Sequence, residues 1–167
     1  MIERLGLHMN SDKLSVEELV EYYKPDVEQL VAYIPWFEQQ KGKMAAQTYT
    51  GDGLAQTSVA FPVYDGMLMN FVRTAQKSTL MDRNYVYVYS RNRIRTVEDE
   101  LKFIRRATIK EMGELWGILS KYILKGMTKG TLWSEGVRTG VFLELILKMQ
   151  EIIAFWDKEG MLQQERE

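Results

Sequence analysis

The chain has 167 residues, of which 46% are hydrophobic and 27% charged, and its formal net charge is −1. These values are typical of one globular domain with a sizeable core, and they exclude a disordered chain, a collagen and a membrane protein. The lack of cysteine excludes a disulfide scaffold, a thiolate metal site and a cysteine nucleophile. The single histidine, His8, excludes a multi-histidine metal site.

The location of the protein is predicted from its apolar segments. The N-terminal sequence MIERLGLHMN has no apolar run and is unlike a signal peptide. The longest apolar run, residues 141–156, contains Glu144, Lys148 and Glu151 and is too short and too polar to span a bilayer. We therefore expect a cytoplasmic protein with no membrane partner.

The first part of the chain predicts two helices. Ser15 and Glu18 form a capping box that begins a helix, and the residue before Pro25 is expected to end it. Pro25 suits the start of a second helix, whose buried stripe runs from Val27 to Ile34. Pro35 is expected to break or kink this helix, and Trp36 and Phe37 are then expected to anchor the turn in the core.

Residues 44–62 differ in composition from the rest of the chain. They are rich in Gly, Thr, Ala and Gln, and Tyr49 and residues 59–63 have strand character. A turn signal, Gly51-Asp52-Gly53, lies between these two runs. We interpret the segment as a small β-hairpin or an irregular insertion.

The remaining residues predict five further helices, at about 64–78, 96–107, 108–124, 131–138 and 139–158. Thr96 with Asp99 and Thr108 with Glu111 mark two of the helix starts, and Gly126 fits a left-handed position after a helix end. The last helix is apolar almost all round and should be surrounded by others. The fold class is therefore mainly α: a single-domain helical bundle, residues 1–160, around a buried C-terminal helix, followed by a polar tail, residues 161–167.

Several sequence stretches resemble a bacterial and phage-associated family of domains of unknown function that is common in Firmicutes. They are YIPWFE (33–38), FPVYD (61–65), LMDRNY (80–85) and LWGILSKYILKGMTKGTLWSEGVRTGVFLELILKM (115–149). The resemblance spans about residues 30–155. It implies a helical fold, a helix rather than a strand at residues 83–95, and a phage or mobile-element setting. It supplies no activity, ligand or site residue.

Residues 83–95, RNYVYVYSRNRIR, are the first candidate binding segment. As a strand, one face would carry Tyr85, Tyr87 and Tyr89, followed by Arg91, Arg93 and Arg95, with Lys102, Arg105 and Arg106 further on. Tyrosine rings stack on bases and guanidinium groups hold phosphates, so this face would suit a nucleotide or a single nucleic-acid strand. The alternation favours a strand. The alternative is a helix with packed tyrosines and with arginines that face water or pair with acidic residues 98–100.

The loop from Lys125 to Thr131 is the second candidate. It holds Lys125, Lys129 and two glycines before a helix start, where backbone N–H groups attract anions, although the P-loop spacing is absent. A plain connection between helices explains the same residues. We expect Trp133, in the following short helix, to lie near the surface.

Acid–base and metal chemistry has little support in the sequence. The carboxylates cluster in first helical turns, where they favour the helix dipole, and no Glu-x-x-His motif exists. No serine nucleophile motif is present. We expect no catalytic residues, no metal site and no cofactor, although Mg²⁺ bound by carboxylates alone stays open.

These observations favour a non-enzymatic binding protein, encoded by a phage or mobile element, that acts on a host protein or on a nucleotide of a host defence pathway. One alternative is a nucleic-acid or nucleotide binder that uses the Tyr85–Arg106 segment. Another is a Mg²⁺-dependent phosphate-handling enzyme built on the 125–131 loop. The aromatic content also fits self-association into a homo-oligomer.

Overall fold

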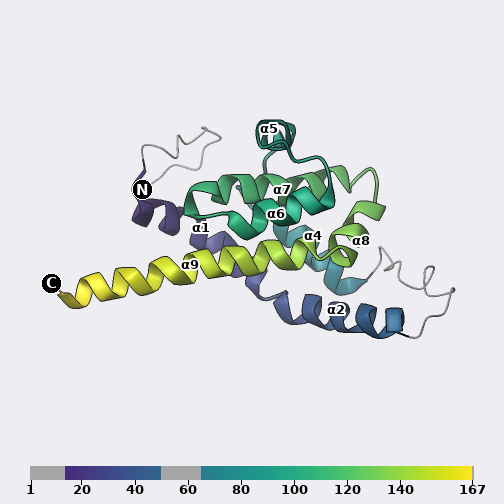
Figure 1. Ribbon diagram of the computed structural model, residues 1–167, viewed down its shortest axis with the longest axis horizontal. Helices are drawn as coiled ribbons and strands as arrows, with labels where there is room; N and C mark the ends of the chain where they lie inside the picture. Colours follow the sequence, from purple (N-terminus) through teal and green to yellow (C-terminus); the bar gives the residue numbers. More distant parts are fainter. Residues whose placement is uncertain (1–13, 50–64, 167) are drawn as a thin grey trace.

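The structure is a computed structural model that describes residues 14–49 and 65–166. These residues form helices that pack on one another, and none of them lies in a β-strand (Figure 1). In chain order the helices are α1 (Val16–Val31), α2 (Ile34–Tyr49), α4 (Gly66–Lys77), α5 (Tyr85–Arg91), α6 (Val97–Arg106), the 3₁₀ turn η2 (Ile109–Glu111), α7 (Met112–Lys125), α8 (Thr131–Arg138) and α9 (Val141–Arg166). The predicted fold class, mainly α, is confirmed.

The predicted β-hairpin at residues 44–62 is not supported. Residues 44–49, including Tyr49, continue α2 as a helix, and the rest of the segment, with the predicted turn at residues 51–53, lies outside the described residues. The helical backbone at this point removes the first strand that the hairpin would need.

The predicted helix end before Pro25 is wrong. Pro25 lies inside α1, which continues to Val31. The missing proline N–H costs one hydrogen bond, but buried residues on both sides of it, such as Val20 and Val27, hold the two halves against α4 and α9. The Lys24 ammonium also lies 2.9 Å from the Asp157 carboxylate of α9.

Pro35 behaves as predicted and separates two helices. It occupies the first turn of α2, where its missing N–H leaves no bond unmade. Phe37 is buried, with its ring in edge contact with Phe71 and near Phe142. The turn between α1 and α2 is therefore fixed by aromatic packing in the core.

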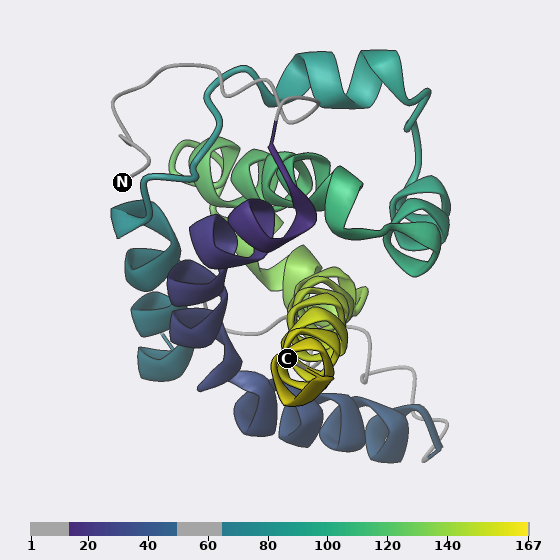
Figure 2. The same ribbon diagram turned by 90° about the vertical axis from the view of Figure 1, so that its left-hand side faces the viewer.

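Helix α9 packs against several of the other described helices. Figure 2 looks along this helix, and α1, α2, α6, α7 and α8 all contact it. Its buried residues continue from Val141 to Ile153, and its C-terminal part extends past the other helices (Figure 1). Gly136 lets α8 approach it closely, because a Cβ there would lie 2.3 Å from the Phe142 ring.

None of the described helices is both long enough and apolar enough to cross a lipid bilayer.

Candidate binding surface

Helix α5, the predicted Tyr/Arg segment, stands at the outside of the molecule above α7 (Figures 1 and 2). The chain reaches it through a turn in which the Asp82 N–H donates to the Ser120 hydroxyl of α7 at 2.8 Å. Val88 of α5 then packs against Gly117 of α7. A Cβ at Gly117 would lie 2.6 Å from a Val88 methyl carbon, so the glycine allows the two helices to approach this closely.

The segment is a helix, so the strand that the alternation favours is wrong. Its inward side carries Tyr85, Val88, Tyr89 and Asn92, at helical spacing, whereas Val86 and Tyr87 are 62% and 67% exposed. Because residues two apart point to opposite sides of a helix, the three tyrosines do not form one stacked face. Only Tyr87 presents an exposed ring.

Tyr89 is held by a buried carboxylate on the neighbouring helix. Glu100 of α6 is 1% exposed. It accepts hydrogen bonds from the Tyr89 hydroxyl of α5, from the Tyr122 hydroxyl of α7 at 2.6 Å and from the Lys121 ammonium at 3.2 Å. Lys121 also lies 4.9 and 4.8 Å from the centres of the Tyr89 and Tyr122 rings. This Glu100 cluster joins three helices through one satisfied charge.

Burial and the negative charge change the acidity of both tyrosines. Desolvation, followed by the charge of Glu100, raises the pKa of Tyr89 well above its usual value. Desolvation and the hydrogen bond to Glu100 raise the pKa of Tyr122 in the same direction. Both hydroxyls therefore keep their protons at neutral pH and act as donors. Tyr89 therefore holds α5 against α6 and α7.

The turn after α5 directs two arginines outward. The Ile94 N–H donates to the Tyr89 carbonyl at 2.9 Å and the Arg93 N–H donates to the Ser90 carbonyl at 3.3 Å. This is the Schellman pattern, which places Arg93 in the left-handed region with φ 55° and buries Ile94. Arg93 and Arg95 are both exposed.

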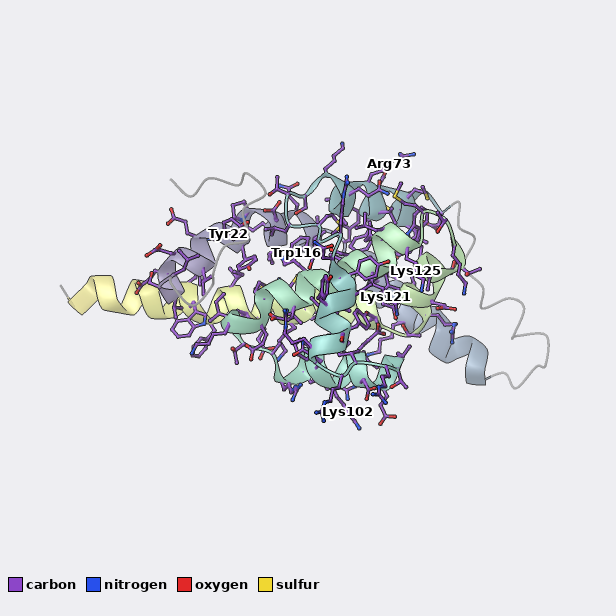
Figure 3. All side chains as sticks on the ribbon, turned by 90° about the horizontal axis from the view of Figure 1, so that it is seen from above. Tyr22, Arg73, Lys102, Trp116, Lys121 and Lys125 are labelled. Carbon is purple, nitrogen blue, oxygen red and sulfur yellow. The ribbon has the colours of Figure 1, made fainter. Side chains whose placement is uncertain are left out.

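The exposed charged residues of this region are mostly basic. Arg91 makes a 3.3 Å ion pair with Glu114, Lys102 pairs with Glu98 at 3.2 Å, and the Arg106 guanidinium lies 5.2 Å from the centre of the Phe103 ring. Figure 3 shows Lys102 at the outer edge of the molecule, with Lys121 and Trp116 further in. Residues 83–110 contain eight basic and three acidic residues, a formal charge of +5 in a chain of net −1.

We define the basic surface as the exposed aromatic and cationic side chains of the turn before α5, of α5 itself, of the turn that follows it and of α6. They are Arg83, Tyr87, Arg91, Arg93, Arg95, Lys102 and Arg106. Arg105, predicted with this group, also lines a separate cleft against α2, α8 and α9.

The second predicted site, the 125–131 loop, is a tight connection between helices. Lys125 and Lys129 are exposed, and the Lys129 N–H donates to the Lys125 carbonyl at 3.1 Å. Gly126 has φ −64°, so its predicted left-handed conformation is wrong. The glycine is required instead because a Cβ would lie 2.1 Å from the Trp133 indole nitrogen.

Trp133 is predicted to lie near the surface, but this prediction is wrong. The side chain is buried, with an exposed fraction of 8%. Its indole N–H donates to the Ile123 carbonyl at 3.2 Å. The indole therefore packs against the end of α7.

Asp99 is used as a helix cap, since it accepts from the N–H groups of Arg95 and Thr96, and these bonds lower its pKa. Among residues 14–49 and 65–166, no three carboxylate or imidazole side chains come together in a way that could hold a metal ion.

Glu100 is the important residue that the sequence analysis missed. The sequence pattern groups it with acidic residues 98–100, in a first helical turn, as an alternative partner for the arginines. Its spacing from Phe103, Ile104 and Ala107 places it on the buried side of α6. A carboxylate within an apolar helical stripe is the signal that could have identified it.

Comparisons with family models, with curated proteins and with solved structures found no match to this chain. The site is therefore interpreted from its own geometry and chemistry.

Proposed function

We propose that the protein is a single-domain, non-enzymatic binding protein whose basic surface holds a single nucleic-acid strand. The observation that carries this proposal is the exposed Tyr87 ring beside a segment of formal charge +5. Arg91 follows Tyr87 by one helical turn, so a guanidinium group and an aromatic ring share the outer side of α5. Proteins that bind single strands combine stacking on aromatic rings with cationic contacts to the backbone.

The charge distribution supports the same proposal. The residues outside 83–110 carry a formal charge of −6, so the two parts of the chain have opposite sign. A polyanion is attracted more strongly to this segment than to the rest of the chain. The Glu100 cluster and the contact between Val88 and Gly117 hold α5 in place, so little ordering is needed when a strand binds.

The experiment is fluorescence anisotropy with a labelled single strand of about 12 nucleotides, in the range of small single-strand sites. We expect binding that weakens roughly fiftyfold between about 50 and 200 mM salt, if about four phosphate contacts are made. Reversing two charges, with Arg83→Glu and Arg95→Glu, should abolish binding. The matched control is Lys125→Glu with Lys129→Glu, which changes the net charge equally on another exposed segment and should retain most of the affinity.

The aromatic part is tested separately. Tyr87→Ala should weaken binding at least fivefold, whereas Tyr87→Phe, which keeps the ring, should not. Undetectable binding at the lowest salt concentration would refute the proposal, and so would an equal loss in the lysine control.

A second candidate is an acidic protein partner, which in a phage setting would be a host protein. The observation that favours it is the pair of exposed side chains Val86 and Tyr87, since an aromatic anchor with an arginine rim is common in protein interfaces. In the same anisotropy experiment, polyglutamate is added as a competitor. If it displaces the labelled strand in proportion to its charge, the result favours an acidic protein partner. Displacement by unlabelled single strands alone would favour nucleic acid.

A further inference from the structure

A cleft lies where α2, α6, α8 and α9 meet, and its volume is about 180 Å³. This volume is below the 300–1,000 Å³ of pockets for drug-sized ligands, so its occupant must be small. The residues that line it are Phe37, Lys41, Leu101, Arg105, Val137, Arg138, Thr139, Gly140, Leu143 and Glu144.

The inner wall of the cleft is apolar. Phe37, Val137 and Leu143 belong to the buried core, and Leu101 packs against it. An apolar ring or a short apolar chain that binds against this wall would be removed from water, which is favourable. No polar group of the wall would be buried by this contact.

The outer wall is cationic. Lys41 of α2, Arg105 of α6 and Arg138 of α8 reach the same cleft from three helices, and Glu144 of α9 is the one carboxylate among the lining residues. Within the part of the chain that the structure describes, none of the three cations makes a salt bridge. The lining therefore has a formal charge of +2, and this charge has no partner there.

The turn from α8 into α9 lies beside these cations. Gly140, with φ 82°, ends α8 and accepts the first hydrogen bond of α9 from the Glu144 N–H at 2.9 Å. Gly140 has no side chain that could cap the first N–H groups of α9. The Thr139 hydroxyl donates instead to the Glu135 carbonyl at 2.6 Å.

We propose that this cleft is a binding site for a small phosphate monoester with an apolar body. A phosphate monoester carries about −1.5 to −2 charges at neutral pH, which matches the charge of the lining. The phosphate would lie among Arg105, Arg138 and Lys41, and the apolar body would contact Phe37 and Leu143. This site is separate from the basic surface and does not depend on the proposed strand binding.

The experiment uses the full chain with phenyl phosphate as the probe. Binding is measured by calorimetry and by changes in amide chemical shifts. We expect binding that shifts the amide signals of residues 137–144. Inorganic phosphate, which lacks the apolar body, should bind at least tenfold more weakly. Benzoate, which has the ring but a single charge, should also bind more weakly than phenyl phosphate.

Variants locate the site. Arg138→Gln and Lys41→Gln should each weaken phenyl phosphate binding about tenfold, because each removes a charged contact. Glu144→Gln should strengthen it, because a repulsive carboxylate is lost. Lys125→Gln, at an exposed lysine outside the cleft, is the matched control and should leave affinity unchanged, as should the Arg83→Glu, Arg95→Glu pair.

Folding of each variant is checked by its circular dichroism melt. If a saturating concentration of phenyl phosphate left the amide signals of residues 137–144 unshifted, the proposal would be overturned. Equal affinity for inorganic phosphate would overturn the role of the apolar wall, and an unchanged affinity in Arg138→Gln would overturn the placement of the phosphate.

Discussion

Among the residues that the structure describes, Arg93 is the non-glycine residue with a positive φ. The direction of the chain between α5 and α6 depends on this conformation. A side chain in the left-handed region costs about 1–2 kcal/mol, and glycine avoids this cost. We therefore expect Arg93→Gly to raise the melting temperature by roughly 2–4 °C, as a gain near 1 kcal/mol does in a chain of this size.

The control for this prediction is Arg91→Gly, two residues earlier. Arg91 is the last residue of α5 and pairs with Glu114, so glycine there should lower stability by up to about 1 kcal/mol. Thermal unfolding of both variants makes the comparison. A lower melting temperature for Arg93→Gly would show that the arginine side chain stabilises the turn by contacts that outweigh its strain.

Helix α5 is held against α7 by the fit of Val88 to Gly117. We expect Gly117→Ala to destabilise the protein by about 1–3 kcal/mol, because the added methyl group overlaps Val88. Val88→Ala should restore part of this loss, so that the double variant is more stable than the sum of the two single changes predicts. Denaturant unfolding of the four proteins measures this coupling.

Gly113, in the same helix, is the matched control. A Cβ there would lie 3.4 Å from the Tyr23 hydroxyl, an ordinary contact, so Gly113→Ala should gain up to about 1 kcal/mol from helix propensity. If the two alanine variants had the same stability, the close approach of α5 and α7 would not be a property of the folded protein in solution.

The unfolding of the whole molecule should depend on alkaline pH through its buried tyrosines. Desolvation raises the pKa of Tyr23 to about 12, and the pKa values of Tyr89 and Tyr122 are also raised. The folded state therefore keeps protons that the unfolded state releases above about pH 10. Stability should be fully present below about pH 10 and should fall as the pH rises through 12.

Urea unfolding from pH 8 to 12 tests this expectation, with tyrosine ionisation followed by absorbance. Tyr89→Phe with Tyr122→Phe should lower stability at neutral pH but flatten its alkaline dependence, because fewer groups then differ between the two states. Tyr87→Phe, at an exposed ring, is the control and should leave the profile unchanged. An unaltered slope in the double variant would contradict the coupling to the Glu100 cluster.

Helix starts could be predicted from the sequence because their signals are local. Thr96 with Asp99 and Thr108 with Glu111 both form the expected capping boxes, and Ser15 accepts from the Glu18 N–H at 3.2 Å. The helix end expected before Pro25 depends on packing between segments far apart in the sequence. Local patterns contain no information on such packing, so this prediction failed.

The candidate site could be located but not oriented. The basic residues of 83–106 are exposed, yet Val and Tyr occur on both sides of α5. The alternation between them therefore did not show which side is buried. The buried side is determined by Gly117 and Glu100, which lie on other helices. The cleft charges Lys41, Arg105 and Arg138 are likewise far apart in the sequence, and only folding brings them together.

The central position of α9 has a consequence for biosynthesis. Ribosomes make the chain from its N-terminus, so α1, α2, α6, α7 and α8 are complete before the helix that they surround exists. Until residues 141–153 emerge from the exit tunnel, the nascent polypeptide must carry an uncovered apolar face, which chaperones recognise. A message broken upstream of codon 141 would thus yield only protease-sensitive fragments.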